Sequence, residues 1–171
     1  MKKCAAGLLV LFVLICCTCA ANAADVDADE MLAEELPNVA LPGWGGFEIP
    51  SGTTEVDMYM NNPCRNQDWY NLTFEVWAAI PEDQIAEDAE TQIVQESDEN
   101  GNINETLYVM LYRSEQVKPG EGIEHIALTQ PLSAGRYKMF VHMQPYFIMN
   151  GLPVPNNGNL FIYLDVLDTA Q

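Results

Sequence analysis

The sequence has very little positive charge. Only seven Lys and Arg residues accompany 25 Asp and Glu residues among 171, which gives a formal net charge of −18 at pH 7. A surface of that sign repels nucleic-acid phosphates and anionic lipid headgroups. We therefore expect no nucleic-acid partner, and contact with a membrane only through a signal segment or a lipid anchor.

Cysteine and histidine are also scarce. Four of the five cysteines lie within the first 19 residues, so Cys64 stands alone in the rest of the chain, and the histidines are His125 and His142. Beyond residue 19 no intrachain disulfide can form, and the domain must be held by its core. The simplest interpretation of Cys64 is a small buried apolar residue, and a reactive or intermolecular thiol is the alternative.

Motifs of catalysis are missing as well. The chain has no Gly-x-Ser-x-Gly, no His-Glu-x-x-His and no glycine-rich phosphate loop, so nucleophilic, zinc and nucleotide chemistry find no support. Acidic residues are so numerous that neighbouring carboxylates carry no information, which leaves a hydrolase as an alternative. We expect no catalytic residues, no cofactor and no enzymatic activity.

The first 23 residues have the organisation of a signal peptide. Lys2 and Lys3 precede an apolar run over 4–15, and small residues follow, with Ala21 and Ala23 in the Ala-x-Ala pattern that predicts cleavage after Ala23. Two alternatives stay open. The apolar stretch 4–21 is at the lower limit for an uncleaved membrane anchor, and Cys17 is a possible lipidation site, although Cys16 is an unusual residue before it.

Removing residues 1–23 from the 171 leaves 148, a length that predicts one domain. Residues 24–41 are acidic and end near Pro37 and Pro42, which is typical of a tether. The folded domain is then expected over 42–171. An extracytoplasmic location follows, either secreted or at the cell surface.

Period-two alternation of apolar and polar residues dominates from residue 47 onward and predicts strands with one buried face. Turn-forming sequences such as Lys118-Pro119-Gly120 separate these segments. The fold predicted is all-β, an antiparallel immunoglobulin-like β-sandwich with an N-terminal signal helix and an acidic insertion. Its strands, about seven, are expected at 47–49, 55–60, 69–77, 107–112, 123–128, 137–143 and 160–166.

One detail favours the immunoglobulin-like form. In the spacing Leu132-x-x-Gly135-x-Tyr137, a tyrosine at the start of a late strand can turn its hydroxyl back onto the preceding corner, as in the tyrosine corner of those folds. Ordinary strand packing of Tyr137 is an equal alternative.

The acidic insertion covers residues 81–105, with nine acids and no base. Ile93 and Val94 predict a short strand within it, and one or two helical turns are expected over 82–90. Oxygen-bearing side chains alternate at its end, which suggests a calcium site at Asp98, Asn100, Asn102 and Asn104. The match to an EF-hand loop is partial, because Gly101 is the fourth residue and Val109 the twelfth, and a solvated hairpin tip explains the same residues.

Aromatic residues supply the candidate binding surface. Trp69 and Trp77 fall on the strand face opposite Leu72 and Phe74, where polar residues are expected. They are either a stacking platform for a sugar or peptide, or are buried under the acidic insertion. Tyr146 and Phe147, beside Pro145, admit the same two interpretations.

Several turn and core motifs of the sequence occur in an order that is similar to that of a known group of proteins. Leu41-Pro42-Gly43, Asn62-Pro63-Cys64-x-Asn66, Pro119-Gly120, the tyrosine-corner spacing and Leu164-x-Val166 occur in this order. In these it resembles a group of small, uncharacterised, exported or lipid-anchored immunoglobulin-like β-sandwich proteins of Gram-positive gut bacteria. The resemblance implies a fold and an extracytoplasmic location, but no activity; the long acidic insertion and the imperfect lipidation site depart from it.

The function expected is a non-enzymatic binding or display module of the cell envelope or a secreted one, with a surface protein or a glycan as partner. Alternatives are an accessory carbohydrate-binding module or extracellular hydrolase, and a subunit of a surface assembly. An unpaired, uncharged edge strand would indicate the assembly.

Cleavage after Ala23 is testable directly. The exported protein should begin at Ala24, and Ala23→Phe should leave the precursor uncut, because the peptidase pocket admits only small side chains. Mass spectrometry of the exported chain measures both results, with Ala20→Phe as the matched control outside the recognised pair. A chain beginning at a lipid-modified Cys17 would contradict this prediction.

Overall fold

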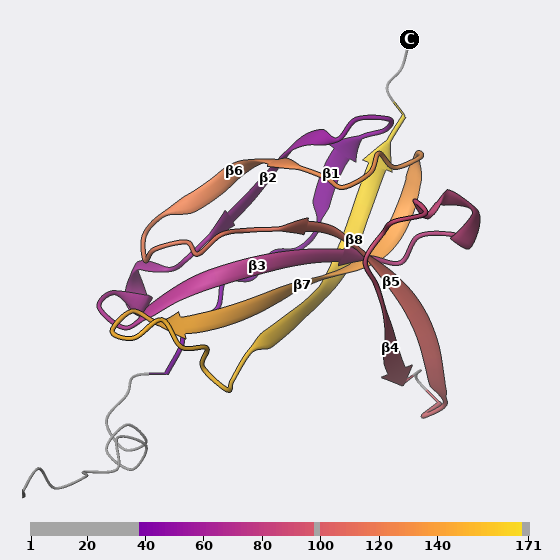
Figure 1. Ribbon diagram of the computed structural model, residues 1–171. Helices are drawn as coiled ribbons and strands as arrows, with labels where there is room; N and C mark the ends of the chain where they lie inside the picture. Colours follow the sequence, from indigo (N-terminus) through magenta and orange to yellow (C-terminus); the bar gives the residue numbers. More distant parts are fainter. Residues whose placement is uncertain (1–37, 98–99, 169–171) are drawn as a thin grey trace, which may run out of the picture. The chain divides into compact units, whose positions relative to one another are not determined.

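The computed structural model describes residues 38–97 and 100–168 (Figure 1). The expected signal helix, Cys17, Ala21, Ala23 and Asp98 lie outside these residues. In the described part, helical structure is limited to two short 3-10 turns, Cys64–Asn66 and Glu82–Gln84. No helix there has the length and hydrophobicity to cross a bilayer.

The described chain is built of strands, which confirms the all-β prediction. Each of the seven predicted segments lies on a strand, and an additional strand falls inside the acidic insertion at the place where Ile93 and Val94 predict it. In chain order the strands are β1 (Phe47–Pro50), β2 (Glu55–Asn61), β3 (Tyr70–Ala78), β4 (Thr91–Ser97), β5 (Ile103–Arg113), β6 (Gly122–Ala127), β7 (Gly135–Phe147) and β8 (Gly158–Leu167).

The strands form a six-stranded sheet, in the order β1-β8-β7-β3-β5-β4, and a two-stranded sheet of β2 and β6. The expectation of purely antiparallel pairing is wrong at one place, because β1 runs parallel to β8. The short β1 closes the free edge of β8 and buries Ile49, which is 2% exposed. The chain then turns at Gly52, where φ is 73°, and enters the other sheet as β2.

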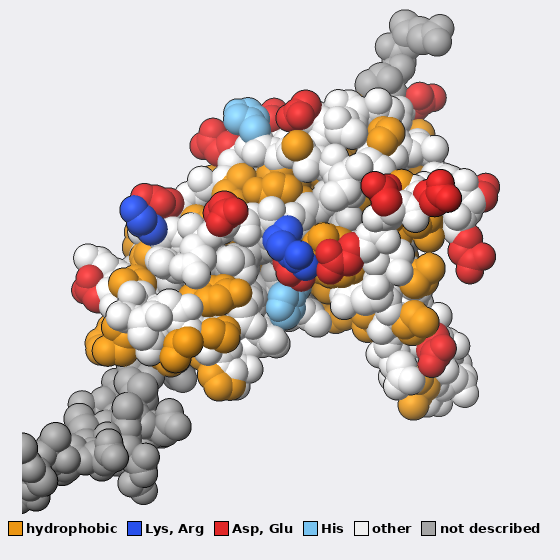
Figure 2. Space-filling view, in the orientation of Figure 1, with side chains coloured by type: hydrophobic (Ala, Val, Ile, Leu, Met, Phe, Trp, Pro, Cys, Tyr) orange, Lys and Arg blue, Asp and Glu red, His pale blue; other side chains and the backbone are white. Residues whose placement is uncertain are grey.

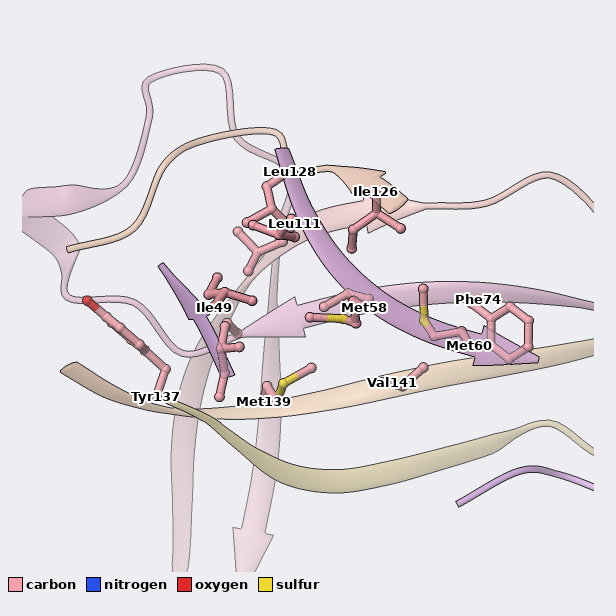
Figure 3. Close-up of a cluster of buried hydrophobic side chains, with 14 of the residues drawn as sticks. Ile49, Met58, Met60, Phe74, Leu111, Ile126, Leu128, Tyr137, Met139 and Val141 are labelled. Carbon is pink, nitrogen blue, oxygen red and sulfur yellow. The ribbon is translucent and has the colours of Figure 1, made fainter. Parts of the chain in front are cut away.

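One core fills the space between the two sheets (Figure 3). The even-numbered residues of β2 point into it, as the alternation predicts, and meet even-numbered residues of β3 and odd-numbered residues of β7. Burial of these apolar faces from both sides is what joins the sheets. The residues are Val56, Met58 and Met60 of β2, Leu72, Phe74 and Val76 of β3, and Met139, Val141 and Met143 of β7.

The buried side chains of Asn62 and Asn66 connect four segments by hydrogen bonds at one end of the domain. Asn62 donates through Nδ2 to the carbonyl oxygens of Tyr70 and Val117, both at 2.9 Å, and accepts from Asn66 Nδ2 at 2.7 Å. Asn66 also bonds the backbone N–H and C=O of Ala40, each at 2.8 Å. Both side chains are almost fully buried, so each bond satisfies a group that water cannot reach.

Cys64 corrects a sequence expectation, because it is exposed rather than buried. It belongs to the 3-10 turn that separates Asn62 from Asn66. Those two asparagines point inward, and the cysteine between them points away from the core. The geometry of the turn, and not the apolar character of the side chain, therefore places Cys64 at the surface.

Tyr137 has the hydroxyl contact that its spacing predicts. The phenol is largely buried, and its oxygen donates to the carbonyl oxygen of Ser133 at 2.8 Å. This bond ties the start of β7 to the corner before it. Gly135, whose φ is 158°, lies against the edge of the same ring.

Loss of the Asn62 side chain should destabilise the fold. We expect Asn62→Ala to lower the free energy of unfolding by about 2–4 kcal/mol, because it removes three hydrogen bonds among buried groups. Denaturant unfolding followed by fluorescence measures the change. Asn104→Ala, at an exposed strand position, is the control and should stay within about 0.5 kcal/mol of wild type; an equal loss in both variants would contradict the assignment.

Candidate functional site

The β4–β5 hairpin forms an arm that leaves the body of the six-stranded sheet. β5 pairs with β3 only over residues 109–113, whereas its residues 103–108 pair with β4 alone. The register between β3 and β5 shifts between Val76 and Trp77, and such irregularities bend a strand. Figures 1 and 2 show the arm projecting from the rest of the domain.

A second, small core lies on the outer face of the large sheet, away from β2 and β6. It consists of Trp77, Tyr108 and Phe140, all at most 4% exposed. The Trp77 and Phe140 rings stack with centroids 6.1 Å apart, and Tyr108 meets Phe140 edge-on at 4.9 Å. Val94 of β4 packs against this group, so the arm is folded over the outer face.

Polar contacts close the arm onto β7. The carboxylate of Glu96 in β4 accepts hydrogen bonds from Tyr108 and Thr106 and pairs with the Lys138 ammonium at 3.0 Å. The hydrogen bond from Tyr108 is the largest cause that lowers the pKa of Glu96, and Lys138 adds to it. Burial, and then the adjacent carboxylate, raise the pKa of Tyr108, so Tyr108 stays a neutral donor.

A groove of about 500 Å³ runs between the arm and β8. Its polar wall includes Gln95, Glu96 and Lys138, and its apolar wall includes Phe161 and Tyr163 of β8. The two rings of β8 are 50% and 45% exposed. Phe161 packs beside Phe140, centroids 5.2 Å apart, and the Arg136 guanidinium lies 4.3 Å above the Tyr163 ring.

The structure does not bring the predicted tryptophans together. Trp69 lies in the turn before β3 and not on the strand, whereas Trp77 lies near the far end of β3. Eight residues separate them, which is up to roughly 26 Å along an extended chain. Trp69 is 39% exposed, whereas Trp77 is 4% exposed and donates through Nε1 to Glu75. The burial of Trp77 under β4 corresponds to the second interpretation given above.

The remaining predicted residues lie elsewhere. Tyr146 and Phe147 are half-buried at the end of β7, where Phe147 packs on Tyr70. Of the candidate calcium ligands, Asn100, Asn102 and Asn104 are exposed at the tip of the arm, and Asn104 stands opposite Glu96 in the β4–β5 ladder. Asp98 is outside the described residues, so the calcium site stays a prediction.

Phe161 and Tyr163 are not among the residues predicted for a site, although the sequence carries a signal for them. Apolar residues occupy both faces of β8, where the outer face should be polar. Moreover, residues 139–164 contain no Asp, Glu, Lys or Arg in a chain that is otherwise densely acidic. An uncharged hairpin with aromatic residues on its outward face indicates a surface kept free of charge.

Metal-binding and comparison results complete the description of the site. Across 38–97 and 100–168, no three His, Cys, Asp or Glu side chains come together in a way that would hold a metal ion. His125 contacts Asp57 and His142 contacts Asn159, on different sheets. Comparison of the chain with protein-family models, characterised proteins and solved structures finds no match.

The Glu96 contacts make the stability of the arm dependent on pH. Because the folded-state pKa of Glu96 is below its ordinary value of 4.5, its stabilisation is present above about pH 4.5 and is lost as pH falls through the lowered pKa. We expect Glu96→Gln to lower the free energy of unfolding by about 1 kcal/mol at neutral pH, and by less at a pH below the lowered pKa of Glu96.

Denaturant unfolding of both proteins at the two pH values measures this difference. Glu124→Gln, at an exposed position of β6, is the matched control and should behave as wild type at both. A Glu96→Gln effect that is equally large at low pH would show that the carboxylate charge is not what holds the arm.

Proposed function

We propose that this protein is a non-enzymatic, extracytoplasmic binding module whose groove between the arm and β8 holds a neutral glycan. The observation that carries the proposal is the pair of exposed rings of Phe161 and Tyr163, which line one groove with the hydrogen-bonding side chains of β4. A sugar ring has flat apolar faces and a rim of hydroxyl groups. Flat rings beside a few fixed polar groups are the surface that such a ligand requires.

Charge favours a ligand without net charge. The acidic surface repels polyanions, and the cations near the groove already have partners. Lys138 pairs with Glu96 at 3.0 Å, and Arg136 lies 3.4 Å from Asp165 and over the Tyr163 ring. No described cation of the groove is therefore left to attract a phosphate or sulfate group.

The location and the finer fold assignment belong to the same proposal. The N-terminal residues have the pattern of an export signal. The domain needs no disulfide for stability outside the cell, because one apolar core holds both sheets together. The Tyr137 hydroxyl bonded to Ser133, together with two facing sheets, supports an immunoglobulin-like sandwich.

Replacement of the two groove rings should abolish binding. We expect Phe161→Ala and Tyr163→Ala each to weaken binding of a neutral oligosaccharide about tenfold, the effect of losing one stacked ring, and the double variant to bind none. Isothermal titration of the processed protein against a panel of neutral and sulfated cell-surface oligosaccharides measures this.

Tyr59→Ala is the matched control, because Tyr59 is a 53% exposed aromatic residue of the other sheet. It should bind as wild type does. Undiminished binding by the double variant, or a preference for sulfated chains, would contradict the proposal.

A further inference from the structure

We propose that two copies of this chain associate through the free edges of their β4 strands, antiparallel and with Val94 at the twofold axis. The two six-stranded sheets then become one continuous sheet. The pairing goes beyond the proposed ligand, although β4 supplies both the pairing edge and, through Gln95 and Glu96, one wall of the groove.

The outer edge of β4 carries backbone groups that are directed away from the sheet. β4 is the last strand of the six, and no strand in the described chain pairs with its far side. The carbonyl oxygen of Glu90 accepts from Met110 N–H of β5 at 2.9 Å, which fixes the direction of every second peptide group. The N–H and C=O groups of Ile93 and Gln95 therefore point outward.

The free edge of β4 lacks the features that prevent strand addition at the other sheet edges. β1 is four residues long and ends in Pro50, and β2 and β6 carry exposed acids and a register shift. β4 has seven residues, an unbroken register and a 64% exposed Ile93. Its one charged side chain, Glu96, turns toward Lys138. Unprotected edges of this kind add another strand.

The sequence of β4 is complementary to itself. Antiparallel pairing about Val94 places Thr91 opposite Ser97, Gln92 opposite Glu96, and Ile93 opposite Gln95. None of these pairs brings like charges together. Val94 is the middle residue of β4, so this register pairs all seven residues of the strand, whereas centring the pair on Ile93 would pair only five of them.

The axis of such a pair is perpendicular to the sheet, so both grooves face the same side. Seven residues bury a small interface, and each copy is strongly acidic. Association is therefore expected to be reversible and stronger at high salt, which screens the repulsion.

Disulfide trapping tests the register. In the full processed protein carrying Cys64→Ser, Val94→Cys should form a covalent dimer under mild oxidation. Residues facing each other at a non-hydrogen-bonded position are about 4.5 Å apart between Cα atoms, within disulfide range. Ile93→Cys is the matched control, because it is more exposed but its partner lies diagonally, about 7–8 Å away.

We expect at least about fivefold more dimer from Val94→Cys than from Ile93→Cys on gels without reductant. Equal trapping of the two, or trapping only of the more exposed one, would overturn the proposed pairing. Sedimentation velocity of the wild type in about 0.05 and about 1 M NaCl gives an independent measurement, with more dimer expected at the higher salt.

Ile93→Pro removes one outward N–H and leaves the bonds to β5 in place. It should be monomeric at both salt concentrations with an unchanged circular dichroism spectrum. A wild type that is monomeric throughout, or an Ile93→Pro protein that still dimerises, would overturn the inference.

Discussion

The buried amides of Asn62 and Asn66 are the constraint on which the rest of the domain depends. No disulfide fixes the sheets to each other, and apolar packing alone is not directional. The two asparagines supply direction, because each of their bonds has one partner and one geometry. They hold four segments in one arrangement: the end of β2, the start of β3, the chain at Val117 and the chain at Ala40. The core residues pack next to these fixed segments.

The large sheet serves two cores, one on each face. Its inner face packs on β2 and β6, while Trp77, Tyr108 and Phe140 make a separate cluster on its outer face. The second cluster exists because the arm folds over it and brings Val94 and the Glu96 carboxylate across β3 to β7 and β8. The shape of the groove therefore depends on a few contacts made by β4. A pocket inside the main core would instead be shaped by the packing of both sheets.

Most of the strands could be predicted from the sequence, and the groove could not. Alternation in β2, β3 and β7 locates buried faces because one side of each strand meets water and the other meets a core. That rule fails for the outer face of Trp77 and Phe140, where both sides of a strand are apolar and only the path of the arm decides which residue is covered. Phe161 and Trp77 have similar patterns in the sequence, yet one is exposed and the other is buried. Cys64 shows the same limit, because a local turn overrides its preference for the interior, and the parallel β1–β8 pair depends on a long-range return of the chain.

The bonds between Asn66 and Ala40 also fix the point where the chain enters the domain. The chain enters the domain beside Asn66, next to the start of β3, whereas the arm leaves from the other end of that strand near Ala78. Nine extended residues separate these ends. The groove therefore lies at the end of the domain opposite the point where the chain enters it.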